Sequence, residues 1–448
     1  MIFINPIFKK RTCDLLSWSN EFFDEIFSKN PFRAIRVNSL KTDFNTVQSC
    51  FEFELKNTPF YKESYYIPSD FEGVGNLPLH HAGGFYVQEP SASSVLTVID
   101  AKPYEKILDL CAAPGGKSTG IAAALNGEGL LWSNEYIRNR ASILLSNIER
   151  MGVSNAVVSS LSADYLCSSL EGFFDAVLVD APCSGEGMWR HNEQVEKQWS
   201  EDYVLKCAEL QKEILSAAAN AVASGGRLIY STCTFAKEEN EDNVIWFLEN
   251  HPEFTLQKIS ADFGINGLSG VDEIDSKVRR IIPTNGGEGH FVALFRKSGE
   301  KTASNICFEE NISSESKKIV TEFLNHNFTK LPQGVLFEKN NLIYLVPQSA
   351  PQIKGDVLRY GLLIGELRKN RLEPAHCLFN AAGVVPKRVL NLTFNDERLY
   401  RFLKGEEIVV EGEKGYTAVW VENVPLGFGK CSGTRLTNRY PKGLRLFN

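Results

Sequence analysis

Residues 106–126 read KILDLCAAPGGKSTGIAAALN, and this stretch decides the fold. A short apolar run is followed by a turn with two consecutive glycines, and the turn is followed by a segment rich in alanine, a strong helix former. A strand, a tight glycine turn and a helix in this order begin the doubly wound α/β domains. In such domains the turn lies at the carboxyl end of the strand, where ligands bind.

The turn comes close to the phosphate-binding loop of nucleoside triphosphatases. That loop has the spacing G-x-x-x-x-G-K-[ST], and counting back from Gly116 and Lys117 puts Cys111 where its first glycine must stand. No acidic residue follows a predicted strand in a form suited to holding magnesium. The sequence therefore argues against a triphosphate site.

Five more apolar runs follow, with helix-like stretches between them. They lie at residues 130–135, 155–164, 174–182, 226–234 and 289–297. Continuous apolar strands separated by crossover helices indicate a parallel sheet that is covered on both faces. We therefore predict a doubly wound, Rossmann-like α/β domain in which the last strand closes the edge of the sheet.

The remaining chain divides by composition into flanking units. We predict four domains, at residues 1–100, 101–298, 306–380 and 385–448. The first is expected to be a small α+β domain, and the polar stretch 297–305 a linker. The third is expected to be a small α/β domain with a hairpin around Asn340 and Asn341, and the fourth a β-rich, barrel-like module with glycine turns.

Bulk composition excludes several classes of protein. The chain of 448 residues has a formal net charge of -7, and its ten cysteines form no C-x-x-C pair that would suggest zinc or a redox dithiol. We expect no metal. No apolar run reaches the roughly 18 residues of a membrane helix, and the N-terminus puts its apolar residues before its basic ones, unlike a secretory signal. We expect a cytoplasmic protein without a membrane segment.

Polar and reactive side chains follow the predicted strands. Glu135 ends the second strand, where nucleoside-binding folds place a carboxylate for the ribose hydroxyls, and Asp164 follows the third. Cys183 follows the fourth strand in DAPCSG, and Cys233 follows the fifth in STCT. Two thiols at one end of a sheet, beside a nucleoside pocket, are hard to attribute to packing.

At this point the motifs resemble those of one family. LDLCAAPGGKST (108–119), DAPCSGEGMWR (180–190), YSTCTFAKEEN (230–240) and GGEGHFVAL (286–294) are similar to the motifs of the RNA 5-methylcytosine methyltransferases, the NOP2/Sun family. RVNSLK (36–41) and YVQEPSAS (86–93) resemble its upstream motifs. The two-part C-terminal tail, with a PUA-like ending, looks like the bacterial RsmF-like branch of this RsmB/RsmF-type family, which modifies small-subunit ribosomal RNA.

The resemblance implies a cofactor and a site for it. The cofactor is S-adenosylmethionine, held by the loop after the first strand, which consists of Cys111, Ala112, Ala113, Pro114, Gly115, Gly116 and Lys117. Glu135 is expected to take the ribose and Asp164 the adenine side, while Asp180 closes the pocket near the methionine end and the target base. The role of Lys117 within this loop stays open.

The resemblance also implies the roles of the two thiols. Cytosine C5 is a poor nucleophile, so a thiolate must first add to C6. By resemblance this nucleophile is Cys233, and Cys183 helps to resolve the covalent adduct. Asp180 would hydrogen bond to the edge of the base. DNA 5-methylcytosine enzymes use the Pro-Cys thiol as nucleophile, so exchanged roles remain an alternative.

The implied substrate is 16S ribosomal RNA or the small subunit, and the enzyme is expected to be a monomer. Cationic residues of the flanking domains are candidate phosphate contacts: Arg33, Arg36, Lys41, Arg435, Arg439, Lys442 and Arg445. Transfer RNA is the alternative substrate. A non-catalytic RNA-binding or ribosome assembly factor leaves the thiols unexplained, and a cysteine hydrolase would need a partner from His191 or His290, neither of which has an orienting acid at a telling spacing.

Overall fold

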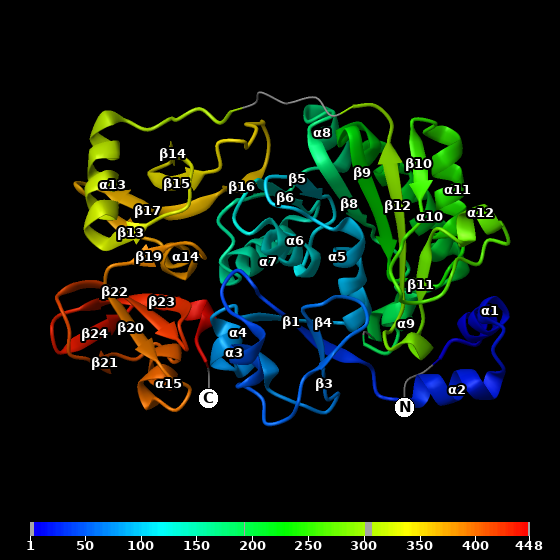
Figure 1. Ribbon diagram of the computed structural model, residues 1–448, viewed down its shortest axis with the longest axis horizontal. Coiled ribbons are helices and arrows are strands. Elements are labelled where there is room, and N and C mark those ends of the chain that lie inside the picture. Colours follow the sequence, from blue (N-terminus) through cyan, green and yellow to red (C-terminus); the bar gives the residue numbers. More distant parts are fainter. Residues whose placement is uncertain (1–3, 192, 301–306, 447–448) are drawn as a thin grey trace.

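The computed structural model describes residues 4–191, 193–300 and 307–446. Its centre is a mixed sheet, around which the N-terminal elements, in blue, and the C-terminal elements, in yellow to red, are arranged (Figure 1). The strands of this sheet, in spatial order, are β10 (Phe254–Gln257), β12 (His290–Lys297), β9 (Val222–Thr232), β8 (Phe174–Asp180), β5 (Lys106–Asp109), β6 (Leu130–Asn134), β7 (Ala156–Ser159) and β16 (Val357–Tyr360).

Five adjacent strands of this sheet, from β9 to β7, are parallel, and helices cover both faces. On one face lie α5 (Ser94–Ile99), α6 (Gly116–Leu125) and α7 (Arg138–Arg150). On the other lie α8 (Ala163–Ser169), α10 (Glu201–Ala221) and α11 (Glu241–Asn250). Because both faces are buried, the strands are mostly apolar, and the predicted doubly wound Rossmann-like core is confirmed.

The edges of the sheet differ from the prediction. β12 does not close the sheet, because it lies between β9 and β10 and pairs antiparallel with both, and the short strand β11 (Arg279–Ile281) also pairs with it. At the other edge β16 pairs with β7, although it comes from the segment that the sequence assigns to the third domain. Residues 301–305 of the predicted linker lie outside the described residues.

The N-terminal region forms two packing units. A four-stranded antiparallel sheet has the order β2 (Lys56–Asn57), β3 (Ser64–Ile67), β1 (Arg33–Val37) and β4 (Phe85–Gln88). Ahead of it, α1 (Pro6–Leu16) and α2 (Asn20–Ser28) pack against the central domain instead, where Phe8 stacks on Trp189 at 4.0 Å between ring centroids. The first residues therefore lie against the segment that follows β8.

Three small sheets lie in the C-terminal region, and the smallest pairs β13 (Phe328–Lys330) with β19 (Val385–Pro386). Another contains β14 (Val335–Lys339), β15 (Leu342–Val346), β17 (Leu362–Arg368) and β18 (Arg371–Pro374), with α13 (Ser314–Asn327) and α14 (His376–Asn380) packed beside it. The predicted hairpin is confirmed, since Asn340 and Asn341 join β14 to β15 with positive φ angles of 53° and 63°. A two-residue turn with both φ angles positive is the geometry that asparagine tolerates.

The module at the end of the chain is rich in β-strands, as predicted, and five of them form one sheet. Its order is β20 (Val389–Leu392), β22 (Gly415–Val421), β23 (Val424–Cys431), β24 (Arg435–Asn438) and β21 (Ile408–Val409), and α15 (Glu397–Leu403) packs on it. Hydrophobic residues of this module and of the N-terminal sheet share one core. The two flanking regions that were expected to hold RNA are thus packed against each other.

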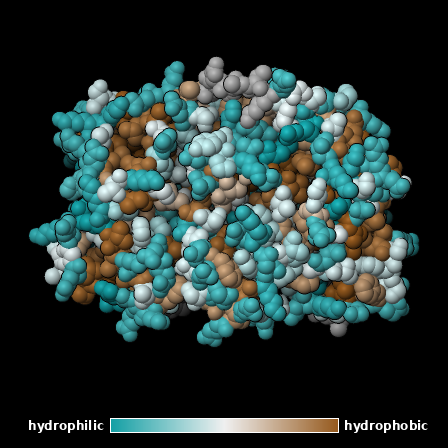
Figure 2. Space-filling model, viewed as in Figure 1, coloured by the Kyte–Doolittle hydropathy of each residue, from teal (hydrophilic) through white to brown (hydrophobic). Residues whose placement is uncertain are grey.

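The surface in view is mostly hydrophilic, with hydrophobic side chains in smaller patches between (Figure 2). Within the described ranges, the helices are all too short or too polar to cross a membrane. Among these same residues, His, Cys, Asp and Glu side chains do not gather in groups of three or more that could hold a metal ion.

Candidate active site

The site lies at the switch point of the central sheet, where β5 is flanked by β6 on one side and β8 on the other. The loop after β5 turns at Gly115, whose φ of 114° lies in the region that favours glycine, and α6 begins at Gly116. A side chain on Gly116 would lie 3.3 Å from the Oε1 atom of Gln88 and from the Tyr86 ring. Gly115 therefore allows the turn, and Gly116 allows the loop to pass close to β4.

A buried acid that sequence analysis overlooked anchors the loop. Asp109, the last residue of β5, accepts a 2.6 Å hydrogen bond from the Ser118 hydroxyl, and Ser118 lies 2.8 Å from the Ser133 hydroxyl of β6. Burial raises the pKa of Asp109 to about 7. The feature of the sequence that could have indicated this role is an acid at the end of an otherwise apolar strand.

The two acids predicted to contact the cofactor differ in burial: Glu135 is buried, whereas Asp164 is exposed. Glu135 is 4% exposed, and its carboxylate accepts a 2.9 Å hydrogen bond from the Ile137 amide and lies 3.3 Å from Arg140. It is thus held in place at the end of β6, as a ribose acceptor requires. Asp164 is an exposed acid in the first turn of α8. The Ala112 amide in the loop after β5 donates a 2.8 Å hydrogen bond to the Asn134 carbonyl, so the loop that leads into α6 lies beside the end of β6. A carboxylate at a strand end beside such a loop fits a nucleoside cofactor.

The two thiols meet. Cys183 follows β8 and Cys233 follows β9, and their Sγ atoms lie 3.3 Å apart as free thiols. The parallel register pairs Asp180 with Ser231, so the loops after both strands leave the sheet side by side. The hydrogen bond with Cys233, together with burial, raises the pKa of Cys183 well above its ordinary value.

Lys117 and Asp180 form an ion pair beside the thiols. The Lys117 Nζ atom lies 2.7 Å from one Asp180 oxygen, and the Ser231 hydroxyl donates a 2.7 Å hydrogen bond to the other. Burial raises the pKa of Asp180, but Lys117 and His290 outweigh it and hold that pKa below its ordinary value. Burial lowers the pKa of Lys117, but Asp180 and the nearby Cys233 together raise it. Both groups are therefore charged at neutral pH. Lys117, whose role the sequence left open, is the partner of Asp180 in this ion pair.

The histidines do not form a hydrolase site. His290 is 3% exposed, and burial lowers its pKa to about 3. Within the part of the chain that the structure describes, its ring nitrogens have no hydrogen-bond partner. The Nε2 atom of His290 lies 3.9 Å from an Asp180 oxygen. The Nε2 atom of His191 lies 3.9 Å from an oxygen of Glu288 instead. Among the described residues neither histidine hydrogen bonds to Cys183 or Cys233, as the base of a cysteine hydrolase would.

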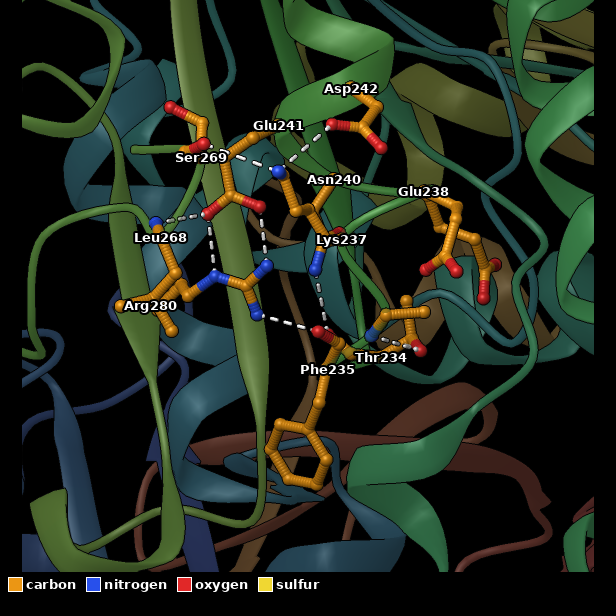
Figure 3. A network of polar contacts seen from close by, with 12 residues as sticks. Thr234, Phe235, Lys237, Glu238, Asn240, Glu241, Asp242, Leu268, Ser269 and Arg280 are labelled. Atoms are coloured by element: carbon orange, nitrogen blue, oxygen red, sulfur yellow. Dashed lines mark hydrogen bonds and ion pairs between the residues drawn. The ribbon is translucent and has the colours of Figure 1, made fainter. Parts of the chain in front are cut away.

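The segment after Cys233 is fixed by a buried ion pair (Figure 3). Arg280 of β11 donates to both carboxylate oxygens of Glu241, and its third nitrogen donates a 2.7 Å hydrogen bond to the Phe235 carbonyl. Glu241 also accepts a 2.9 Å hydrogen bond from the Leu268 amide. A charged network thus holds the chain two residues beyond the thiol.

The structure corrects two of the predicted RNA contacts. Arg36 is fully buried and donates to the Gly116 carbonyl and the Thr119 hydroxyl, at 2.9 and 2.7 Å. The Lys41 ammonium donates to the Ala82 and Pro425 carbonyls and to Asn380, so it joins three regions of the chain. Since these cations are enclosed by protein groups, they do not face an RNA phosphate.

The other cations lie at or near the surface. Arg33 donates to the carbonyls of Ser69 and Phe71. In the tail, Arg435 is exposed and lies 3.3 Å from Glu407, whereas Arg445 is half-buried and donates to the Tyr440 carbonyl. Two further tail cations, Arg439 and Lys442, are exposed.

Family models match most of the chain. Residues 96–296 match the model of 16S rRNA methyltransferase RsmB/F, and residues 4–90 match the N-terminal domain of 16S rRNA methyltransferase RsmF. Residues 322–381 match the RsmF rRNA methyltransferase first C-terminal domain, and residues 389–446 the methyltransferase RsmF PUA domain.

Similar proteins agree with these models. The chain is 31% identical to ribosomal RNA small subunit methyltransferase F of Vibrio campbellii over 92% of this chain and 91% of that protein. It is 30% identical to the protein of that name from Klebsiella pneumoniae, over 92% and 90%. A solved methyltransferase homologue from Pyrococcus horikoshii is 27% identical, with a TM-score of 0.55 over 66% of this chain and 100% of that one. NSun6 from Pyrococcus horikoshii, solved with SFG, is 21% identical with a TM-score of 0.58 over 66% and 99%, and supports the fold alone. The chain belongs to the RsmB/F family of 16S rRNA methyltransferases.

Proposed function

We propose that this protein methylates C5 of a cytidine in 16S ribosomal RNA, with S-adenosylmethionine as the methyl donor and Cys233 as the nucleophile. The observation that carries the proposal is the pair of thiols 3.3 Å apart, beside the Lys117–Asp180 ion pair, at the ligand-binding end of the sheet. The names of its relatives, which are small-subunit ribosomal RNA methyltransferases, support the substrate.

The residues around the loop after β5 would hold the cofactor. We propose that the backbone of residues 111–117 contacts it, that Glu135 accepts hydrogen bonds from its ribose, and that Asp164 lies on its adenine side. When bound, S-adenosylmethionine supplies an electrophilic methyl group. Asp180 would close the pocket near the methionine end and the target base.

The thiols would then act on the target base. The Cys233 thiolate adds to C6, which raises the electron density at C5, and a thiol suits this task because it is both nucleophile and leaving group. The Lys117 ammonium would offset the negative charge of that thiolate. Asp180, charged and oriented by Ser231, would accept a hydrogen bond from the edge of the base. Cys183, in contact with Cys233, would help to resolve the adduct.

RNA binding is assigned to the flanking regions. The target base must leave its stack, at a cost of a few kcal/mol, which favours a cytidine in a loop or at a helix end. We propose that the domains of residues 1–100 and 385–448 hold the surrounding RNA, with Arg33, Arg435, Arg439, Lys442 and Arg445 as phosphate contacts. Because the relatives named above are bacterial and are named for ribosomal RNA, we propose that the enzyme acts in the cytoplasm.

The test uses radiolabelled S-adenosylmethionine with isolated small subunits, naked 16S ribosomal RNA and bulk transfer RNA in separate reactions. Label in 5-methylcytidine from the ribosomal fractions supports the proposal, and label only in transfer RNA replaces the substrate. We expect Cys233→Ser to abolish labelling and Cys183→Ala to accumulate protein bound covalently to RNA. Cys307→Ser, which changes an exposed cysteine, is the matched control and should behave as wild type. Full activity of Cys233→Ser would move the nucleophile to Cys183.

A further inference from the structure

Two buried carboxylates connect the thiol loops in a reciprocal manner. Glu239, which follows Cys233 in the chain, accepts a 2.9 Å hydrogen bond from the backbone amide of Ser184, the residue next to Cys183. Glu186, which follows Cys183, accepts 3.0 Å hydrogen bonds from the Thr234 hydroxyl and the Phe235 amide, next to Cys233. Each loop therefore carries the acid that holds the other loop. Glu239 is fully buried and Glu186 is 3% exposed.

A chain of hydroxyl groups joins these two acids. The Ser184 hydroxyl contacts one oxygen of Glu239 and lies 2.8 Å from the Thr234 hydroxyl, which in turn contacts Glu186. The order Glu239, Ser184, Thr234, Glu186 thus contains three contacts between oxygen atoms. Every such contact needs one proton, and the two hydroxyls supply only two. The third proton must be on one of the carboxyl groups.

The surroundings favour that extra proton. Burial raises the pKa of Glu239 to about 7 and also raises the pKa of Glu186. The titratable and charged groups that face the pair are Cys183 in its loop, Tyr203 and Cys207 of α10, Tyr230 of β9 and Arg11 of α1. Arg11 is the cation of this set, and it also pairs with Glu238 at 2.8 Å. A second negative charge in the pair is thus poorly compensated.

We propose that Glu239 and Glu186 are positioning residues that share one proton and cross-link the two thiol loops, which keeps Cys183 against Cys233. Their effect on RNA methylation rests on the proposed function, whereas their effect on the distance between the thiols does not. Gln211 of α10 supports the arrangement, because its amide donates to both Glu239 and the Pro182 carbonyl, at 2.8 and 3.0 Å.

Glutamine at position 239 distinguishes a shared proton from a required negative charge. Its amide nitrogen donates to Ser184 as a protonated carboxyl does, and its oxygen accepts from the Ser184 amide. Glu239→Gln therefore preserves the contacts of the protonated pair, whereas Glu239→Ala removes them. Glu238→Gln changes the neighbouring acid, whose side chain is 31% exposed, and is the matched control.

The first readout is the rate at which diamide links Cys183 to Cys233 as a disulfide, measured by mass spectrometry of peptides from the full chain. In this reaction the two thiols are oxidised and diamide is reduced to its hydrazine. We expect Glu239→Ala to slow the linkage at least tenfold, and Glu239→Gln and Glu238→Gln to stay within twofold of wild type. Melting curves verify that each variant is folded. An unchanged rate in folded Glu239→Ala overturns the proposal.

The second readout is release of the RNA adduct as a function of pH, in variants that make 5-methylcytidine. Release by wild type divided by release by Glu239→Gln should fall as the pH rises above about 7, because only glutamate loses the shared proton. Equal loss of linkage and release in Glu239→Gln and Glu239→Ala would overturn the shared proton and indicate a required charge. If wild type makes no 5-methylcytidine with any RNA, the proposed function fails, and the diamide result still decides the cross-link.

Discussion

Arg280→Met should destabilise the central domain strongly, because it removes one half of the buried ion pair behind Cys233. The side chains of Arg280 and Glu241 are 2% and 0% exposed. After the substitution, Glu241 keeps the Leu268 amide as a donor but loses its counter-charge, and the Phe235 carbonyl loses its 2.7 Å partner. Methionine fills much of the vacated volume, so the cavity term is small. Breaking a buried pair on one side costs about 3–5 kcal/mol.

This free energy translates into a measurable change in melting. For a domain of this size about 1 kcal/mol lowers the melting temperature by roughly 2–4 °C, so we expect a fall of about 10 °C by calorimetry or circular dichroism. The double variant Arg280→Met with Glu241→Met removes both charges and should recover most of that loss, since the penalty comes from the charge left unpaired. A fall of less than about 2 °C in the single variant, or no recovery in the double variant, would refute the reasoning.

Three further substitutions test the roles assigned to individual charged residues. Lys41→Met should lower stability by about 2 kcal/mol, because it leaves three acceptors without their ammonium donor, yet leave the salt dependence of RNA binding unchanged. Arg439→Ala should instead reduce the slope of log affinity against log salt by about 1 without affecting the melting temperature. If Lys41→Met reduces that slope and leaves the melting temperature unchanged, Lys41 is a phosphate contact after all. Asp109→Asn should flatten the pH dependence of unfolding: burial raises the pKa of Asp109 to about 7 in the folded state, so wild-type stability falls as pH rises from about 4 to 7. The free energy of unfolding is measured by chemical denaturation at pH 5, 6 and 7. If it depends on pH as steeply in Asp109→Asn as in wild type, burial of Asp109 is not the cause.

The sequence predicted the features that depend on local pattern. Continuous apolar runs marked the parallel strands, because a strand that is buried on both faces excludes polar residues, and the glycines at positions 115 and 116 marked the turn into α6. The two thiols were placed correctly because parallel strands present their carboxyl ends at the same edge of a sheet.

What the sequence did not predict depends on contacts between distant residues. Nothing near Arg36 in the sequence shows that Gly116 and Thr119 lie within reach of its guanidinium, so a buried arginine looked like a surface cation. The addition of β16 to the central sheet depends in the same way on the packing of a late segment beside β7. Glu186 and Glu239 stand close to the cysteine motifs, yet their roles appear only once both loops are seen together.

The distance between the thiols follows from strand register and residue count. Asp180 lies opposite Ser231 in the parallel pair, and Cys183 and Cys233 come three and two residues later in the chain. A strand advances about 3.3 Å per residue, so one inserted residue in either loop would displace a thiol by about the separation that the structure shows. Two cysteines at the ends of neighbouring strands therefore do not by themselves bring their sulfur atoms into contact. The offsets Asp-x-x-Cys and Ser-x-Cys, together with the two carboxylates that hold the loops, are what bring the sulfur atoms into contact, and a chain that kept the cysteines but changed either offset would lose this arrangement.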